Sequence, residues 1–294
     1  MLLHFGPKLP PLPATLPSYA EEPDWKQASP VRIQRALRHA LAKPSGGWYA
    51  LDGSRTVGRV PRRFEVEGHE LVAFRDTRDD LVVAPAACPH MGADLSCGRV
   101  EGDRIVCPWH GLALGREGHG RWQPLPSYDD GALAWVRLPE AGVAPSPRPL
   151  LPPRPARFLD AVIRMEARCE PEDVLANRLD PWHGAHFHPH SFARLRVLDD
   201  TEERLVVRVS YRVAGPVASE VDASFHCSDP RTIVMTILAG EGTGSVVETH
   251  ATPLGPGRTA IVEATLVTSD RIGFPAVRAA ARWIRPALEA RARR

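Results

Sequence analysis

The chain has 294 residues, 43% of them hydrophobic, which is enough to bury the core of one large domain or two ordinary ones and argues against a disordered chain. Its 37 basic and 35 acidic residues leave a formal charge of +2, so no overall basic field favours nucleic acid or an anionic membrane as a partner. Five cysteines, an odd number at irregular spacing, favour reduced thiols, some of them metal ligands, over a disulfide framework.

The N-terminal region, residues 1–45, is predicted to be a surface arm followed by a short helix. Residues 1–27 are rich in proline and lack periodicity, which is typical of an extended arm. Ser29-Pro30 is a helix-start signal, and apolar residues then recur at helical spacing as far as Pro44. The start lacks the apolar run of a signal peptide, and no stretch approaches the roughly 20 apolar residues that span a bilayer. We therefore expect a cytoplasmic protein without a transmembrane segment.

The remainder is predicted to form two domains of an α+β chain. Residues 46–140 consist of short alternating runs broken by Gly, Asp and Pro, which indicate a small antiparallel β domain. Residues 139–155 hold seven prolines, so a semi-rigid linker is expected at 141–156. The second domain, 157–294, reads as strands within 196–268 and helices at 172–190 and 275–294 flanking that sheet.

Two short motifs in the β domain mix cysteine and histidine. The segments CPH at 88–90 and CPWH at 107–110 give C-x-H, sixteen residues, then C-x2-H. A Rieske [2Fe–2S] centre holds one iron through two thiolates and the other through two imidazoles. Proline after each cysteine and a glycine near each histidine, Gly92 and Gly111, suit tight turns around such a cluster. The candidate ligands are Cys88, His90, Cys107 and His110.

Two other readings of this motif remain open. A Cys2His2 zinc site uses the same ligand set, although zinc modules usually pair Cys with Cys and His with His in separate halves. The spacing could also arise by accident from two buried cysteines and two surface histidines.

On these residues the chain resembles the Rieske family over residues 46–140. Rieske subunits of the cytochrome bc type carry an extra cysteine in each loop, and these form a disulfide beside the cluster. Ala93 and Trp109 stand in those places here, and Cys97 lies too far along to substitute. The resemblance is therefore to the ferredoxin and oxygenase branch, which lacks the disulfide.

A second motif lies past the linker, at residues 177–188. Four histidines crowd this stretch: His183, His186, His188 and His190. On a regular helix His183 and His188 point about 140° apart, so both could face one metal only if the helix unwinds near Gly184, whereas His186 and His190 would need no distortion. The residues alone leave both pairs open, together with a solvated histidine-rich loop.

The spacing N-x2-D-x2-H-x4-H, over Asn177, Asp180, His183 and His188, resembles the iron motif of Rieske non-haem iron oxygenases. The resemblance selects His183 and His188 as ligands of a mononuclear Fe(II), whose open positions admit O2. It implies a helix-grip-like antiparallel sheet in the catalytic domain. Asn177 would be a polar neighbour of the iron.

The family's third iron ligand is an acid on a helix close to the C-terminus, and here the chain departs from the pattern. Only Asp270 and Glu289 are candidates in that region. We expect either a shortened C-terminus or an unusual third ligand.

The family's acid at position 180 links a cluster histidine of one subunit to an iron histidine of the next. By resemblance Asp180 would connect His110 of one chain to His183 of its neighbour, which implies a ring, most simply a trimer. The alternative interpretation is that Asp180 only caps a turn before Pro181.

The resemblance also implies the partners and the reaction. Electrons would pass from NAD(P)H through a separate ferredoxin or reductase, because the chain has no nucleotide-binding fingerprint. They would serve O2 activation and oxidation of a small molecule, and apolar strand residues favour an apolar or aromatic substrate. The alternatives are a Rieske electron carrier or non-catalytic relative that lacks the mononuclear iron, and a zinc-stabilised binding protein.

Overall fold

The computed structural model describes residues 29–180, 183, 192–214 and 217–292. The predicted short helix is confirmed as α1, Pro30–Leu41, with Ser29 at its N-cap and Pro30 in its first turn. The proposed arm at residues 1–27 lies outside the described residues.

The expected small antiparallel β domain is confirmed between Trp48 and Arg137. Its nine strands form three three-stranded antiparallel sheets, in the orders β1-β9-β8, β2-β3-β4 and β5-β6-β7. The strands are β1 (Trp48–Gly53), β2 (Arg62–Val66), β3 (His69–Arg75), β4 (Leu81–Pro85), β5 (Arg99–Glu101), β6 (Arg104–Val106), β7 (Ala113–Leu114), β8 (Ser127–Asp129) and β9 (Leu133–Arg137), with 3-10 turns at Ser54–Thr56 and Leu95–Cys97.

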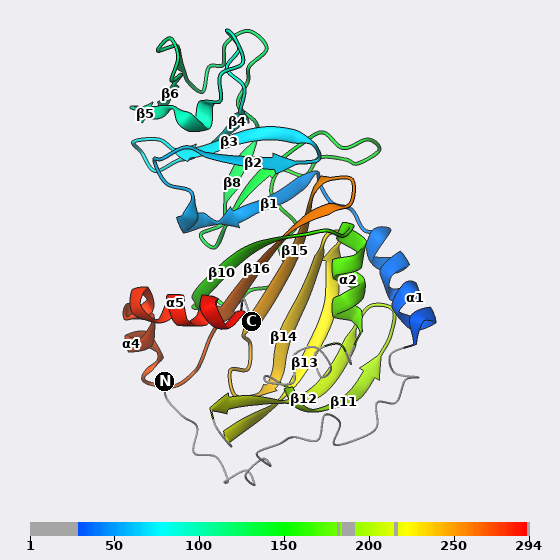
Figure 1. Ribbon diagram of the computed structural model, residues 1–294. Helices are drawn as coiled ribbons and strands as arrows, with labels where there is room; N and C mark the ends of the chain where they lie inside the picture. The colour runs from blue at the N-terminus through cyan, green and yellow to red at the C-terminus, as the bar shows by residue number, and fades with distance from the viewer. Residues whose placement is uncertain (1–28, 181–182, 184–191, 215–216, 293–294) are drawn as a thin grey trace.

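The second domain is a seven-stranded antiparallel sheet in the order β10-β16-β15-β14-β13-β12-β11 (Figure 1). Four of its strands coincide with alternating runs that the sequence predicts. One strand, β10, lies outside the predicted strand region, because its apolar run follows directly on the proline-rich linker. The strands are β10 (Leu159–Ala167), β11 (Phe192–Asp200), β12 (Leu205–Ala214), β13 (Val217–Asp229), β14 (Thr232–Gly240), β15 (Val246–Gly255) and β16 (Arg258–Val267).

The helices agree in part with the sequence prediction. The helix expected over 172–190 ends early, as α2, Pro171–Leu179, because Asp180 precedes Pro181 and takes an extended conformation with ψ of 109°. The C-terminal helix is divided at Ala280 into α4, Phe274–Ala279, and α5, Ala281–Ala292. No helix in the described part of the chain is both long and apolar enough to cross a membrane.

The two faces of the large sheet have different neighbours. One face packs under the β domain, where Trp48 and Trp135 lie in one buried cluster with valines of β14–β16. The other face packs under α1 and α2, where Leu175 of α2 meets Ile233 and Ala251. Asp180, at the end of α2, therefore lies on the face of the sheet opposite to the one that packs against the β domain.

Candidate cluster site and iron segment

The two predicted cluster loops have the same backbone hydrogen-bond pattern. In each, the cysteine N–H donates to the carbonyl of the residue five positions on, over 2.9 Å. The N–H four positions on donates back to the cysteine carbonyl, over 2.8 Å in the first loop and 3.1 Å in the second. The residues are Cys88, Gly92 and Ala93 in one loop and Cys107, Gly111 and Leu112 in the other. Each loop is therefore one closed turn that begins at the cysteine.

A glycine closes each turn, as the sequence predicts. Gly92 has a φ of 76° and Gly111 a φ of 71°, a left-handed conformation that other residues adopt only with strain. No heavy atom lies within 4 Å of the Cβ that would be added at either position. The backbone conformation, not crowding within this chain, is what requires glycine there.

The loops bring the four predicted ligands together as two like pairs. Cys88 and Cys107 are buried, and each thiol lies near enough to the other to affect its pKa. The rings of His90 and His110 are exposed and lie 4.9 Å apart, at an interplanar angle of 73°. Two thiols on the inner side and two imidazoles on the outer side are the donor set that a [2Fe–2S] Rieske cluster requires, with one pair for each iron.

The two thiols experience different environments. Burial raises the pKa of the Cys88 thiol, and the nearby Cys107 raises it further. Burial also opposes ionisation of Cys107, but backbone N–H groups of Trp109 and His110 bring its pKa below the ordinary value. Backbone N–H groups of His90 and Met91 act on Cys88 in the same direction. Both loops thus point N–H donors at sulfur, which stabilises thiolate.

Two large apolar side chains stand exposed beside the histidines. Met91 is 64% exposed and Trp109 is 61% exposed, and the ring of Trp109 meets that of His110 edge-on at 6.4 Å. The histidine edge of the site is therefore an apolar rim at the tip of the β domain.

The iron motif lies only partly within the described residues. Asn177 is exposed near the end of α2, and Asp180 and His183 are half-buried. The His183 Nδ1 atom lies 3.3 Å from the backbone carbonyl oxygen of Asp180. A carbonyl can only accept, so this contact is a hydrogen bond in the tautomer that has its proton on Nδ1, which is also the tautomer whose Nε2 has the lone pair of a metal ligand. His186, His188 and His190 lie outside the described residues, and among those described no three His, Cys, Asp or Glu side chains are placed to hold one metal ion.

The end of α2 is tied to the sheet by an ion pair that the sequence analysis missed. Arg178 pairs with Glu263 of β16, whose side chain is 12% exposed. Glu263 lies on the helix-covered face, because Ile261, two residues before it, packs in the cluster under α2. Of the two predicted candidates for a third iron ligand, Asp270 is exposed and Glu289 lies on α5, which packs against the edge strand β10.

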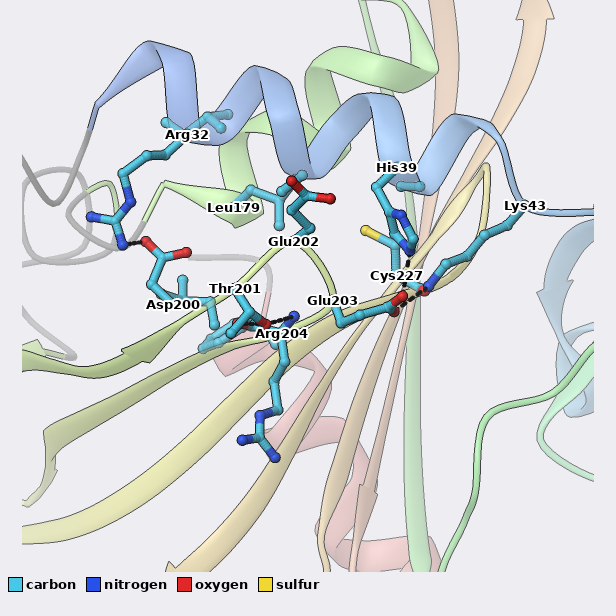
Figure 2. A pocket seen from close by; sticks show the side chains of 15 residues that line it. Arg32, His39, Lys43, Leu179, Asp200, Thr201, Glu202, Glu203, Arg204 and Cys227 are labelled. Atoms are coloured by element: carbon cyan, nitrogen blue, oxygen red, sulfur yellow. Dashed lines mark hydrogen bonds and ion pairs between the residues drawn. The ribbon is translucent and has the colours of Figure 1, made fainter.

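A small hollow lies between α1 and the turn that joins β11 to β12 (Figure 2). Polar side chains of α1 and of the residues just after it pair across the hollow: Arg32 with Asp200, His39 with Glu203 at 2.6 Å, and Lys43 with Glu203 at 3.2 Å. Lys43 also donates to the carbonyl of Cys227 over 2.8 Å. These contacts hold α1 against the sheet. The hollow is therefore part of the packing interface between α1 and the β11–β12 turn.

Known proteins resemble both parts of the chain. Residues 47–135 match the Rieske [2Fe-2S] domain, and residues 140–294 match the family described as domain of unknown function DUF5914. The oxygenase component of 3-ketosteroid-9-alpha-monooxygenase from Mycobacterium tuberculosis (strain ATCC 25618 / H37Rv) is 40% identical over 81 residues, which are 27% of this chain and 20% of that protein. Chlorophyllide a oxygenase from Chlamydomonas reinhardtii is 27% identical over 183 residues, 56% of this chain and 28% of that protein. The matched stretches thus span about a fifth to a quarter of these relatives.

Solved structures share the two-domain arrangement. Dicamba monooxygenase bound to dicamba has a TM-score of 0.57 at 16% identity, covering 76% of this chain and 77% of that one. An oxygenase and ferredoxin complex of carbazole 1,9a-dioxygenase has a TM-score of 0.55 at 15% identity, covering 90% and 84%. The fold and the paired cysteine and histidine loops define a protein of the Rieske oxygenase type, which confirms the resemblance stated above. Within that class, the chain belongs to the family of DUF5914, preceded by a Rieske [2Fe-2S] domain.

Proposed function

We propose that this protein is the oxygenase component of a Rieske non-haem iron system that oxidises an apolar or aromatic small molecule in the cytoplasm. The observation that carries the proposal is the meeting of two buried thiols and two exposed imidazoles on two equivalent turns, in a chain whose second domain has the sheet of an oxygenase catalytic domain. Cys88, His90, Cys107 and His110 would hold the cluster, and His183 and His188 a mononuclear Fe(II).

When bound, these groups supply one-electron transfer and O2 chemistry. The chain's own residues supply position and environment. The backbone N–H groups of both loops stabilise the cysteine thiolates, and the carbonyl of Asp180 fixes the His183 ring in the tautomer that leaves Nε2 available. Asn177 would be a polar neighbour of the second site.

The histidine rim supports a shared site between subunits. His90 and His110 are exposed in the single chain, and Met91 and Trp109 are exposed beside them. Imidazole edges ringed by apolar side chains suit a surface that another subunit covers. We propose a homotrimer in which Asp180 of one subunit meets His110 of the next. A ferredoxin or reductase would deliver electrons from NAD(P)H.

The face of the sheet under the helices supports the substrate class. Partly buried Phe225, Met235 and Ile237 pack there against the buried core of β12 and β13. An apolar lining of this kind favours a hydrophobic or aromatic substrate over a charged one.

The metal content of anaerobically purified protein tests the proposal. We expect three irons and two acid-labile sulfides per chain, with a Rieske EPR signal on reduction. Cys107→Ser should abolish sulfide and signal together, whereas His183→Ala should lower the count to two irons and leave the signal intact. Two irons and two sulfides in the unaltered protein would favour the electron carrier or non-catalytic relative. Zinc without visible colour would contradict both.

Chain mass in solution and electron supply test the remaining parts. Native mass measurement should give three times the chain mass, and Asp180→Asn should leave that mass unchanged while slowing substrate oxidation. A monomer would contradict the bridge between subunits. Reduction of the protein by NADH or NADPH alone, without a donor protein, would contradict the proposed electron route.

A further inference from the structure

The C-terminal helix pair concentrates positive charge that the proposed oxygenase chemistry does not use. Residues 270–294 contain seven arginines and two acidic residues, a net charge of +5, although the whole chain carries only +2. Two of these arginines pair with carboxylates outside the segment, Arg271 with Glu241 and Arg285 with Asp160, so the two pairs reduce the local excess from +5 to +3. A local field of this kind attracts anionic partners even where the net charge predicts none.

The inner face of the pair is fixed to the sheet. Phe274 and Ala281 are buried against Leu159 of β10. Arg285 donates to the carbonyl of Asp160 over 3.0 Å and to its carboxylate over 2.9 Å. Arg278 is itself exposed and reaches inward through Nε, which donates to the carbonyl of Phe158 over 3.0 Å, a contact that does not neutralise its charge. These bonds determine which side of α4 and α5 faces outward.

The outer face of the helix pair is exposed and carries large apolar and basic side chains. Trp283 is 73% exposed and Ile272 is fully exposed. The guanidinium of Arg282 lies over the Trp283 ring, 4.9 Å from its centroid. Among the described residues, no carboxylate pairs with Arg278 or Arg282. Small residues surround the tryptophan and leave it projecting: Ala276, Ala279, Pro286, Ala287 and Ala290 are all exposed.

We propose that this outer face, defined by Ile272, Arg278, Arg282 and Trp283, docks on an anionic lipid surface with both helices lying along it. Tryptophan and arginine side by side on a helix fit the boundary between headgroups and acyl chains, where the ring has apolar contact and the guanidinium meets lipid phosphate. Charge decides between the possible occupants. A second copy of the chain would bring the two arginine clusters together and repel, whereas an anionic bilayer neutralises both.

The position of the helix pair allows docking without blocking the cluster. Figure 1 shows α4 and α5 beside the β10 edge of the large sheet, whereas the β5–β6 hairpin, which joins the two cluster loops, lies at the far tip of the β domain at the top of the view. The histidine rim would therefore remain open to other proteins while the chain is on the lipid surface. Contact with a bilayer would also give the protein access to apolar molecules dissolved there.

Vesicle flotation of the full-length protein tests this proposal. The probes are vesicles of phosphatidylcholine alone and vesicles with about a third of phosphatidylglycerol. The variants are Trp283→Ser and Arg278→Gln/Arg282→Gln. The matched control is Arg59→Gln/Val60→Ser, which removes an exposed arginine and an exposed apolar side chain from the β domain. Visible absorbance of the cluster and the thermal midpoint check that each variant is folded.

We expect binding to the anionic vesicles that weakens as salt rises, and little to the neutral ones. Loss of two arginines should weaken partitioning about 30-fold, at about 1 kcal/mol for each arginine. Loss of Trp283 should weaken it about 10-fold. The control should partition like the unaltered protein. Equal binding to both vesicles, or unchanged binding in both outer-face variants, would overturn the proposal, as would a Trp283→Ser variant that alters chain mass in solution instead.

Discussion

Arg154 holds both carboxylate oxygens of Glu248, through Nε at 2.5 Å and a terminal nitrogen at 2.6 Å. Arg154 belongs to the proline-rich linker, and Glu248 is a fully buried residue of β15. The same guanidinium lies 3.1 Å from Asp130 of the β domain. One linker side chain, itself 11% exposed, therefore joins a buried carboxylate from each domain.

Removing the guanidinium should destabilise the protein strongly. Arg154→Met leaves two buried carboxylates without their cation, and we expect a loss of about 3–5 kcal/mol in the free energy of unfolding. The double variant Arg154→Met/Glu248→Gln should recover part of that loss, because it removes one of the stranded charges. Denaturant unfolding of the two single variants and the double variant measures the coupling. Strictly additive losses would contradict the proposed link.

The same pair should contribute to acid sensitivity. Burial acts to raise the pKa of Glu248, but hydrogen bonds from Arg154 and His250 together with their charges lower it below the ordinary value of 4.5. A carboxyl with a lower pKa in the folded state stabilises the fold above its unfolded pKa and loses that contribution as pH falls through the folded value. Unfolding free energy should therefore decline below about pH 4.5, with a shallower decline in Glu248→Gln. An identical slope in the two proteins would count against this assignment.

Arg178 should govern occupancy of the proposed iron site without affecting the cluster. Its ion pair with Glu263 holds the end of α2, two residues before Asp180, against the sheet. Arg178→Met should cost about 1–3 kcal/mol of stability, because Glu263 is left nearly buried and unpaired. It should also lower iron per chain toward two while sulfide stays at two. Arg208→Met, which breaks an exposed pair with Asp222 on the same sheet, is the matched control and should change neither count.

Gly92 should be replaceable only at the cost of strain. Because its φ is 76° and nothing in the chain lies within 4 Å of an added Cβ, Gly92→Ala tests backbone conformation alone. We expect a loss of about 1–2 kcal/mol, as for any L-residue forced into the left-handed region. Gly68→Ala, at a φ of 73° with the same open surroundings, should cost a similar amount but leave cluster content unchanged. Full cluster retention in Gly92→Ala would show that the turn tolerates a relaxed geometry.

Local signals in the sequence predicted much of the fold. Ser29-Pro30 marked the start of α1, and alternation marked the strands of both domains, since each depends on neighbours within a few residues. The helix predicted over 172–190 is interrupted at Asp180, whose extended conformation follows from the proline after it, and most of residues 181–190 lie outside the described part of the chain.

Long-range partners could not be predicted in this way. The cysteine and histidine spacing indicated which residues would meet at the cluster site, but not that both turns would share one hydrogen-bond pattern. Arg154 was counted as part of a linker, because its partner Glu248 lies 94 residues away and no local pattern connects them. The pair of Arg178 and Glu263 was missed for the same reason, at a separation of 85 residues.

The two cluster loops have the same backbone hydrogen bonds but present their histidines from different positions. Every hydrogen bond that closes these turns joins backbone atoms, and the histidine stands at the second position after the cysteine in one loop and at the third in the other. The turn therefore does not specify which side chain is presented, or from which of the two positions. A donor of different charge could occupy either place while the backbone stayed as it is, so the electronic character of the site can change without any change of fold.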